Sequence, residues 1–209
     1  MAERNSNARN PRRNRRHHHQ RHQHQGNKPD QAASKRYAGV PKSVMIEEPG
    51  VEATAAMDGS GLQVGVISTI DHFAVVDALS TACCSELLLK GVESHNLHIA
   101  QVALPTELPF VTRQLICAAP EPLDAVIVIG CLVEEDSLPM AAVAHAVANA
   151  MMLIGSETMT PVVYGILNCK RMVQARQCAG LTPNGRNFGA EWAQTAITMA
   201  RQGRCSDKI

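Results

Sequence analysis

The sequence predicts an α/β domain: a doubly wound, parallel, four-stranded sheet with helices on both faces. Three observations lead to this class. From residue 61 onward, short apolar runs alternate with longer amphipathic ones. The run at 124–131 is β-branched almost throughout, which is typical of a strand covered on both faces. Each apolar run is followed by a helical pattern, and such crossovers connect parallel strands.

The elements of the first half are expected as follows. Residues 61–68 (GLQVGVIS) predict a strand, and residues 73–90 predict a helix that ends at Gly91, because glycine readily adopts the left-handed conformation that closes a helix. The second strand is expected at 98–102, and a helix follows it at 108–118.

The second half repeats the pattern. The third strand is expected at 124–131, and an Ala-rich helix follows at 139–154. Residues 161–167 predict the fourth strand. Two further helices, at 171–179 and 187–201, complete the order, which requires parallel pairing of the strands.

The 209 residues are enough for one domain and a tail. We expect a disordered Arg/His-rich arm at 1–39, an extended or irregular lead-in at 40–60, the folded domain at 61–204 and a short tail at 205–209. The arm has almost no large apolar side chains with which to offset its conformational entropy. Residues 44–46 are a candidate edge strand for this sheet or for that of a neighbouring subunit.

The net charge of +1 is the sum of a basic arm and an acidic body. Residues 1–25 contain seven Arg and one Glu, whereas the rest of the chain carries 13 basic and 18 acidic residues. The run RRNRR at 12–16 has the charge to bind nucleic acid or another polyanion, or to act as a nuclear address, and a solvated tail explains it equally well. The nearby His tract at 17–19 has no fixed geometry, so no metal site is expected.

Cysteine usage indicates the compartment. The seven cysteines form no CxxC pair and mostly lie in apolar segments, which favours free thiols in a reducing compartment over a disulfide framework or a zinc site. We expect a cytoplasmic protein, or a nuclear one if the arm is an address. The amino terminus lacks the apolar stretch of a secretory signal, and no apolar run is expected to cross a bilayer, so no membrane partner is predicted.

Five segments, in this order, resemble lumazine synthase, an enzyme of riboflavin biosynthesis, across roughly residues 61–202. They are VGVIS with LSTACCSELLLKGV, VALPTELPF, LDAVIVIGCLV, PVVYGILNC, and QARQCAG with NFGAEWAQTAITMA. The last block is similar to fungal members, which have Asn-His-Gly-x-x-Trp at a helix start. The resemblance implies the flavodoxin-like fold of that family, no cofactor, and a homo-oligomer, either a pentamer or an icosahedral shell, with the site between adjacent subunits.

In that family the enzyme is a transferase that condenses 5-amino-6-ribitylaminouracil with 3,4-dihydroxy-2-butanone 4-phosphate. The resemblance gives these substrate-binding candidates: Ile70, Asp71, Thr106, Glu107, Val133, Glu134, Ser137, Tyr164 and Cys178. Ile70 stands where the family has its stacking aromatic, and Thr106 also replaces an aromatic residue. Glu107 keeps the family's carboxylate, and Tyr164 keeps an aromatic ring.

Residues 134–139 (EEDSLP) align with the segment in which the family binds phosphate at a helix start. Pro139 replaces the proton-transfer histidine, Glu134 and Glu135 stand at a basic residue and a glycine, and Cys178 replaces an arginine that contacts phosphate. Losing a charge-assisted contact costs about 1.5–3 kcal/mol, and acids at a helix start repel an anion that the helix would otherwise favour. No catalytic residue is therefore assigned.

Two functions remain open, so the sequence does not decide whether the chain is an enzyme. The first is a catalytically degenerate oligomeric paralogue, a pseudoenzyme retained for its assembly and arm, with or without a catalytic sister subunit. The second is a divergent active synthase, in which Glu107, Tyr164 and backbone groups carry out reduced chemistry on reactive substrates. His72 and His145 are candidates to replace the histidine, and Arg186 with Asn184 to hold the anion, although such residues are more often packed or exposed. A weaker alternative is a pocket re-purposed for a cationic or neutral metabolite. The acids at 134–136 would then hold a divalent cation, unless they simply cap the next helix.

Overall fold

The computed structural model describes residues 57–134 and 140–206. The predicted arm, most of the lead-in with its candidate edge strand at 44–46, and the end of the tail lie outside the described residues. So do residues 135–139 of the third loop.

Four parallel strands form one sheet in the order β2-β1-β3-β4. The strands are β1 (Val64–Thr69), β2 (Leu97–Val102), β3 (Ala125–Val133) and β4 (Val162–Cys169). The chain first moves from β1 to one edge and then crosses back to build the other side of the sheet, so the sheet is doubly wound. The predicted fold class is confirmed.

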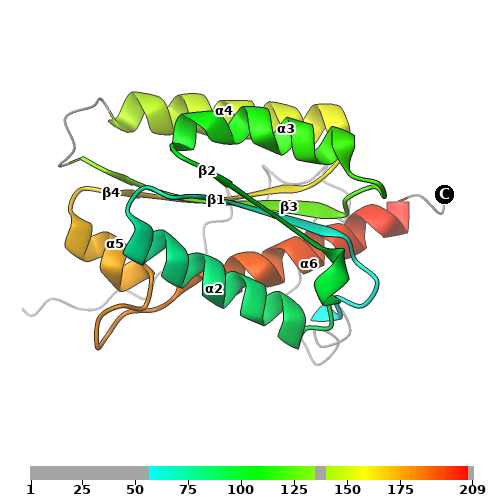
Figure 1. Cartoon of the computed structure of the whole chain (residues 1–209), viewed down its shortest axis with the longest axis horizontal. Helices are drawn as coiled ribbons and strands as arrows, with labels where there is room; N and C mark the ends of the chain where they lie inside the picture. The colour runs from blue at the N-terminus through cyan, green and yellow to red at the C-terminus, as the bar shows by residue number, and fades with distance from the viewer. Residues whose placement is uncertain (1–56, 135–139, 207–209) are drawn as a thin grey trace, which may run out of the picture. The chain divides into compact units, whose positions relative to one another are not determined.

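Helices cover both faces of the sheet (Figure 1). On one face lie α3 (Leu108–Ala118) and α4 (Met140–Thr158). On the other lie α2 (Phe73–Leu89), α5 (Met172–Cys178) and α6 (Phe188–Ser206). Two single 3-10 turns, η3 (Ser94–Asn96) and η4 (Pro105–Glu107), lead into β2 and α3.

The sheet separates two apolar cores, and alternate residues of each strand enter one or the other. In β4, Val163, Leu167 and Cys169 join the core beneath α2, α5 and α6. Tyr164 and Ile166 pack into the core beneath α3 and α4. All nine residues of β3 are buried, as predicted for a strand covered on both faces.

The end of α2 follows the predicted capping pattern. Gly91 has a φ of 94°, in the left-handed region that glycine adopts without steric cost. Its N–H donates to Leu88 O at 3.1 Å, and the N–H of Val92 donates to Leu87 O at 3.0 Å. These bonds satisfy carbonyl groups that the helix itself leaves without partners.

Asn187 fixes the start of α6 and holds it against α2. Its side-chain oxygen accepts from the N–H of Gly189 at 2.9 Å, and its amide donates to Ala78 O of α2 at 2.9 Å. The backbones come so close here that a Cβ on Gly189 would lie 2.1 Å from Leu79 O. The motif NFG therefore begins a helix and also sets the helix–helix packing distance.

Several elements extend beyond their predicted ends. β3 continues to Val133 and β4 to Cys169, and these two residues pair with each other. α4 continues to Thr158 and α6 to Ser206. The strand extensions depend on pairing between segments far apart in the chain, which a local pattern does not reveal.

The expectation that no apolar run is long enough to cross a bilayer does not hold for α4. By length and composition alone this helix would span a membrane, with a mean hydropathy of 1.2 over its most apolar 18-residue window. The same composition also suits the core helix of an α/β domain, and α4 packs on the sheet through Met140, Ala144, Val147, Met151 and Ile154. Only 28% of the window is buried, so much of the helix is apolar and uncovered.

Candidate functional site

The loops that carry most of the predicted site residues meet at one edge of the sheet. Thr69, the last residue of β1, pairs with Val102, the last residue of β2, and β3 ends on the same side. Ligands of open parallel sheets bind at this carboxyl edge. The structure therefore brings together the loops at 70–72 and 103–107, whereas Glu134 lies on the same side of the sheet but five residues beyond Ile129, the partner of Ser68, and so about 16 Å further along.

The first loop presents an aliphatic side chain to solvent. Ile70 is 52% exposed, and its N–H donates to Val102 O at 2.9 Å, which ties the loop to β2. Asp71 is half-buried. His72 precedes α2 with a φ of 45°, a left-handed conformation that is uncommon for a residue with a side chain.

Glu107 has a local structural role in the second loop. One of its carboxylate oxygens, Oε2, accepts from the N–H groups of Ala103 at 2.8 Å and Leu104 at 3.2 Å. The side chain thereby closes the turn that leads into α3. Thr106, beside it, is exposed.

The third loop is described only at its first residue. Val133 is 1% exposed and belongs to the core beneath α2, α5 and α6. Glu134 is exposed, and its N–H donates to Cys169 O at 3.0 Å. Ser137 and Pro139, with the acids at 135–136, lie outside the described residues, so their predicted effect on a bound phosphate stays a prediction.

Tyr164 lies within the sheet and not on one of these loops. It pairs with Val128, which in turn pairs with Ile67 of β1. Its ring packs beneath α4, and its hydroxyl donates to Ala144 O at 3.4 Å. Burial raises the pKa of its phenol, so Tyr164 remains a neutral hydrogen-bonding group.

Cys178 lies on the opposite side of the sheet from Tyr164. It is the last residue of α5, and it packs on the core beneath α2, α5 and α6. It neighbours Cys169, the last residue of β4. Burial and the neighbouring thiol raise the pKa of Cys169, so this pair carries no cation for an anionic ligand.

The remaining candidates are separated from the carboxyl-edge loops or have local partners. His145 is exposed on α4. Arg186 forms an ion pair with Glu191 of α6. Asn184 is exposed in the turn that precedes α6.

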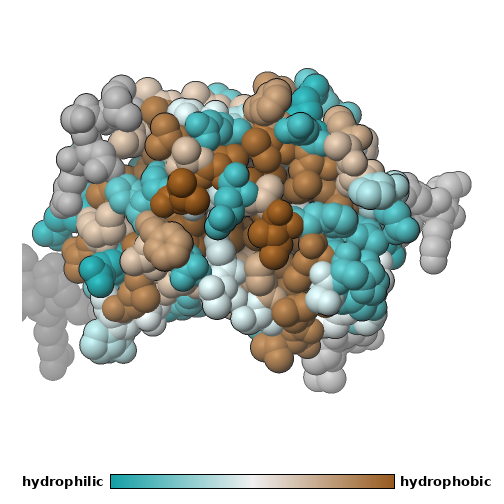
Figure 2. Space-filling view, viewed as in Figure 1, coloured by the Kyte–Doolittle hydropathy of each residue, from teal (hydrophilic) through white to brown (hydrophobic). Residues whose placement is uncertain are grey.

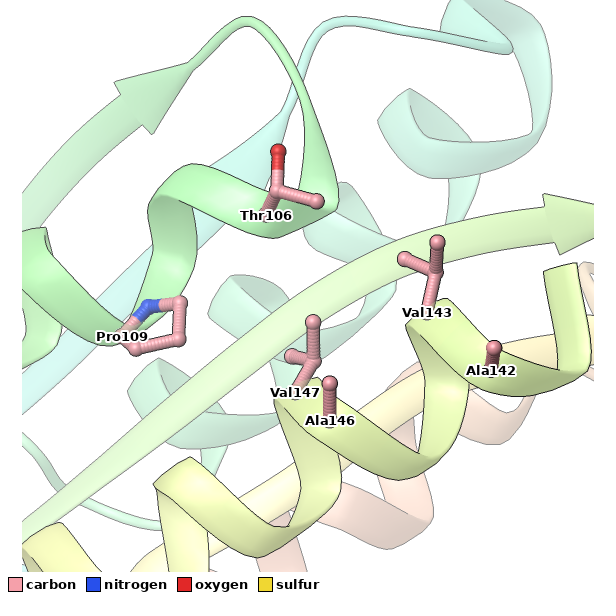
Figure 3. A pocket seen from close by; sticks show the side chains of 6 residues that line it. All are labelled: Thr106, Pro109, Ala142, Val143, Ala146 and Val147. Atoms are coloured by element: carbon pink, nitrogen blue, oxygen red, sulfur yellow. The ribbon is translucent and has the colours of Figure 1, made fainter. Parts of the chain in front are cut away.

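The apolar groove in Figure 3 lies between α3 and α4. Its volume is about 360 Å³. Thr106 and Pro109 line one wall, and Ala142, Val143, Ala146 and Val147 of α4 line the other. Thr106 is the one polar side chain among these described residues, so the groove offers packing surface and no proton-transfer group.

A second cavity, of about 230 Å³, lies between the start of α2 and α5. His72 and Arg176 line it together with Phe73, Ala74, Val75 and Met172. Sequence reasoning missed Arg176, although it stands two positions before Cys178 in QARQC. Its positive charge, so close in sequence to the position at which Cys178 replaces the phosphate-binding arginine, is the signal that could have identified it.

In the described part of the chain, no group of three or more His, Cys, Asp or Glu side chains could hold a metal ion. The alternative of a cation site at 134–136 falls mostly on residues that the structure does not describe.

Comparison with known proteins gives a consistent result. A family model described as 6,7-dimethyl-8-ribityllumazine synthase matches residues 61–204. The chain is similar to relatives of that name: 28% identical over 144 residues to one from Paracidovorax citrulli, covering 69% of this chain and 88% of the relative. For Porphyromonas gingivalis the identity is 29% over 142 residues, covering 68% and 86%. For the fungus Pyricularia oryzae it is 23% over 181 residues, covering 70% and 90%.

Proposed function

Because the chain belongs to the 6,7-dimethyl-8-ribityllumazine synthase family, we propose that it is a catalytically degenerate member that acts as an oligomer. In this proposal the protein is related to riboflavin biosynthesis by descent and has lost the synthase reaction. The alternative is a divergent enzyme that still condenses 5-amino-6-ribitylaminouracil with 3,4-dihydroxy-2-butanone 4-phosphate.

The observation that carries the proposal is the environment of Cys178. Its position matches that of the arginine that contacts phosphate in the family, yet its side chain is partly buried and packs on the core beneath α2, α5 and α6. A neutral thiol supplies none of the charge-assisted bonds on which phosphate binding depends.

Three further positions support the same conclusion. Glu107 retains the family's carboxylate, but Oε2 closes its own loop through two backbone N–H groups. Ile70 offers an exposed aliphatic side chain in place of an aromatic ring, so stacking on the pyrimidine is lost. With Pro139 in the place of the histidine, the chain lacks general acid/base catalysis worth roughly 10²–10⁴-fold in rate.

One observation favours the alternative. His72 and Arg176 line the same cavity, so a proton-transfer group and a cation are available together near the carboxyl edge of the sheet. An active enzyme would depend on this pair, and replacing either residue would abolish its turnover.

The proposal includes a homo-oligomer, either a pentamer or a shell. Tyr164 packs into the core beneath α3 and α4, whereas Cys178 packs on the core on the opposite face of the sheet, so one chain does not assemble all the candidates into one site. A site shared between neighbouring chains accounts for this separation. Co-assembly with an active sister subunit would then restore missing groups from the partner.

The basic arm is a separate part of the proposal. Seven arginines in residues 1–25 supply the charge to bind nucleic acid or another polyanion. Such binding weakens steeply with salt, because each neutralised phosphate releases counterions. Titrating single-stranded RNA at increasing ionic strength, with the full chain and with a chain lacking residues 1–25, tests this part.

Formation of 6,7-dimethyl-8-ribityllumazine by the purified protein tests the main proposal. We expect absorbance to rise at the spontaneous rate, the same as with heat-denatured protein. A double variant, Pro139→His with Cys178→Arg, tests whether two side chains suffice to restore turnover. Product above the background from the unaltered protein would contradict the proposal and direct attention to His72 and Arg176.

A further inference from the structure

A polar cavity of about 440 Å³ lies at the amino edge of the sheet, opposite the edge that carries most of the candidate site residues. Its walls come from the residues before β1, from η3 and the start of β2, and from the loop between α3 and β3. Its polar lining consists of Gln63, His95, Asn96, His98 and Glu121. Cavities of this size hold small molecules. Ligands of open parallel sheets bind at the carboxyl edge, so the fold class alone does not account for this cavity.

Gln63 is the centre of a hydrogen-bond network in the cavity. Its Nε2 group donates to Glu121 Oε2 and to Asn96 Oδ1, both at 3.0 Å. Asn96 is only 7% exposed, and its Nδ2 group donates to Glu93 Oε2 at 3.1 Å. On the other side of Gln63, the Nε2 atom of the His98 ring lies 2.9 Å from the amide oxygen, Oε1. The network therefore joins the segments that precede β1, β2 and β3.

The two carboxylates fix the direction of every bond in this network, because a carboxylate oxygen only accepts. The amide nitrogen of Gln63 must therefore face Glu121. In the same way, the amide nitrogen of Asn96 must face Glu93. Oε1 of Gln63 is then left for the His98 ring, and since this oxygen also only accepts, the proton lies on Nε2 of His98. In the neutral ring the other nitrogen, Nδ1, is an acceptor.

The groups that this network leaves available to a ligand are acceptors. Within the described residues, no further hydrogen bond engages Oε1 of Glu121 or Nδ1 of His98. Glu121 is exposed and His98 is half-buried, so both are accessible from the cavity. Both N–H groups of the Gln63 amide are, in contrast, already used. A complementary ligand must therefore supply hydrogen-bond donors.

The charge around the cavity favours a cation. Glu93 and Glu121 contribute two carboxylates, and hydrogen bonds from backbone N–H groups hold the pKa of Glu93 below its ordinary value. Arg204 donates to the backbone oxygen of Gly61 in the cavity wall, but its guanidinium is paired with Asp124 through two bonds. The imidazoles of the lining add no charge in their neutral form.

We propose that this cavity binds a small organic cation with several N–H donors, either an amine or a guanidinium compound. The donors of the cation bond Oε1 of Glu121 and Nδ1 of His98, and the carboxylates of Glu121 and Glu93 match its charge. A metal ion is a poorer match, since no group of three or more His, Cys, Asp or Glu side chains in the described ranges could hold one. The proposal is independent of the synthase reaction, because the cavity lies at the other edge of the sheet.

Isothermal titration calorimetry of the full-length protein with agmatine tests the proposal, because agmatine carries a guanidinium at one end and an ammonium at the other. We expect saturable binding of one agmatine per chain at physiological ionic strength, where exposed surface charges are screened. Putrescine, with an ammonium at each end, identifies the head group: tighter binding of agmatine assigns the guanidinium, and equal or tighter binding of putrescine assigns the ammonium. Butane-1,4-diol, the uncharged analogue of putrescine, should not bind.

A matched pair of variants makes the test specific. Glu121→Gln removes the charge but keeps an oxygen that accepts from Gln63, and we expect agmatine to bind about 10–100-fold more weakly, the loss of one charge-assisted hydrogen bond. Asp77→Asn removes the same charge from an exposed position on α2, on the other face of the sheet, and should leave the affinity unchanged. Thermal unfolding verifies that both variants are folded.

Two results would overturn the proposal. The first is the absence of saturable binding by both agmatine and putrescine. The second is equal weakening of agmatine binding by Glu121→Gln and Asp77→Asn, which would indicate general attraction to an acidic surface and no specific site.

Discussion

Gly165 is a single position at which one added carbon atom has a large effect. A Cβ there would lie 2.7 Å from Cε3 of Trp192 and 2.8 Å from Val128 O. Because Gly165 has no side chain, the indole ring of Trp192 in α6 packs directly on the backbone of β4. Trp192 in turn lies beside Phe188, with ring centroids 6.4 Å apart.

We expect Gly165→Ala to lower the free energy of unfolding by about 1–3 kcal/mol, because the extra methyl overpacks this contact. Urea denaturation measures the change. Gly203→Ala is the matched control: Gly203 lies in α6 with no heavy atom within 4 Å of the added Cβ, and alanine should stabilise the helix by about 0.5–1 kcal/mol. Equal effects at both positions would refute the packing argument.

Glu93 is a second residue with a testable role. Hydrogen bonds from its own N–H and from the N–H of Gly61 hold the pKa of its carboxyl below the ordinary value. Its stabilising contribution is therefore present above the ordinary carboxyl pKa and is lost as pH falls through the lowered value of the folded protein. We expect Glu93→Gln to flatten the acid side of the stability curve below about pH 4, as measured by urea midpoints. Parallel curves for both proteins would count against this role.

The identity of Glu107 predicted its location in the fold, but it did not reveal the hydrogen bonds that the side chain makes. Glu107 was correctly expected on a loop at the carboxyl edge, because parallel strands end there together. Its hydrogen bonds to Ala103 and Leu104 depend on the path of the backbone, which the sequence pattern does not specify. The substrate contact that the resemblance implies stays a prediction, and the structure adds that Oε2 of this carboxylate closes its own turn.

At the scale of elements, the entry into α3 depends on that carboxylate. We expect Glu107→Ala to destabilise the protein by about 1 kcal/mol, the usual cost of removing a side-chain cap from backbone N–H groups. Glu107→Gln should retain most of the stability, since an amide oxygen also accepts these bonds. Thermal unfolding of the three proteins provides the comparison. An equal loss for Gln and for Ala would indicate that the charge of the carboxylate, and not the capping oxygen alone, provides the stability.

Element order and type were predictable from hydrophobic periodicity, but several boundaries were not. The pattern ended the third strand at 131 and the fourth at 167, whereas the pairs Leu132–Asn168 and Val133–Cys169 continue the ladder. The last backbone hydrogen bonds of β3 and of β4 are therefore made between these two strands. α4 similarly continues to Thr158, beyond the predicted end at 154.

At the scale of the whole molecule, the outward side of α4 is the strongest indication of assembly. Met152 and Leu153 are 63% and 61% exposed, and Phe110 of α3 is 73% exposed. Figure 2 shows several hydrophobic patches, separated by hydrophilic residues, on the face of the molecule where β2 lies in Figure 1. Extended apolar surface of this kind marks interaction sites in proteins.

We expect Leu153→Asp to shift the protein to smaller species at micromolar concentrations, because a buried unpaired charge opposes association. Size-exclusion chromatography with light scattering gives the mass. Leu89→Asp is the control on the opposite face of the sheet, where Leu89 is 80% exposed. Dissociation by Leu89→Asp alone would place the interface on the α2 side instead.

The sequence by itself determined the α/β class, the order of strands and helices and the family resemblance, and it predicts that the family's histidine and arginine are replaced. These properties follow from local periodicity and from residue identity at aligned positions. Only the tertiary structure decided that Tyr164 lies beneath α4, that Cys178 packs on the core of the opposite face and that His72 shares a cavity with Arg176. Such contacts depend on strand register and on helix packing across the sheet, and these are set by segments far apart in the chain.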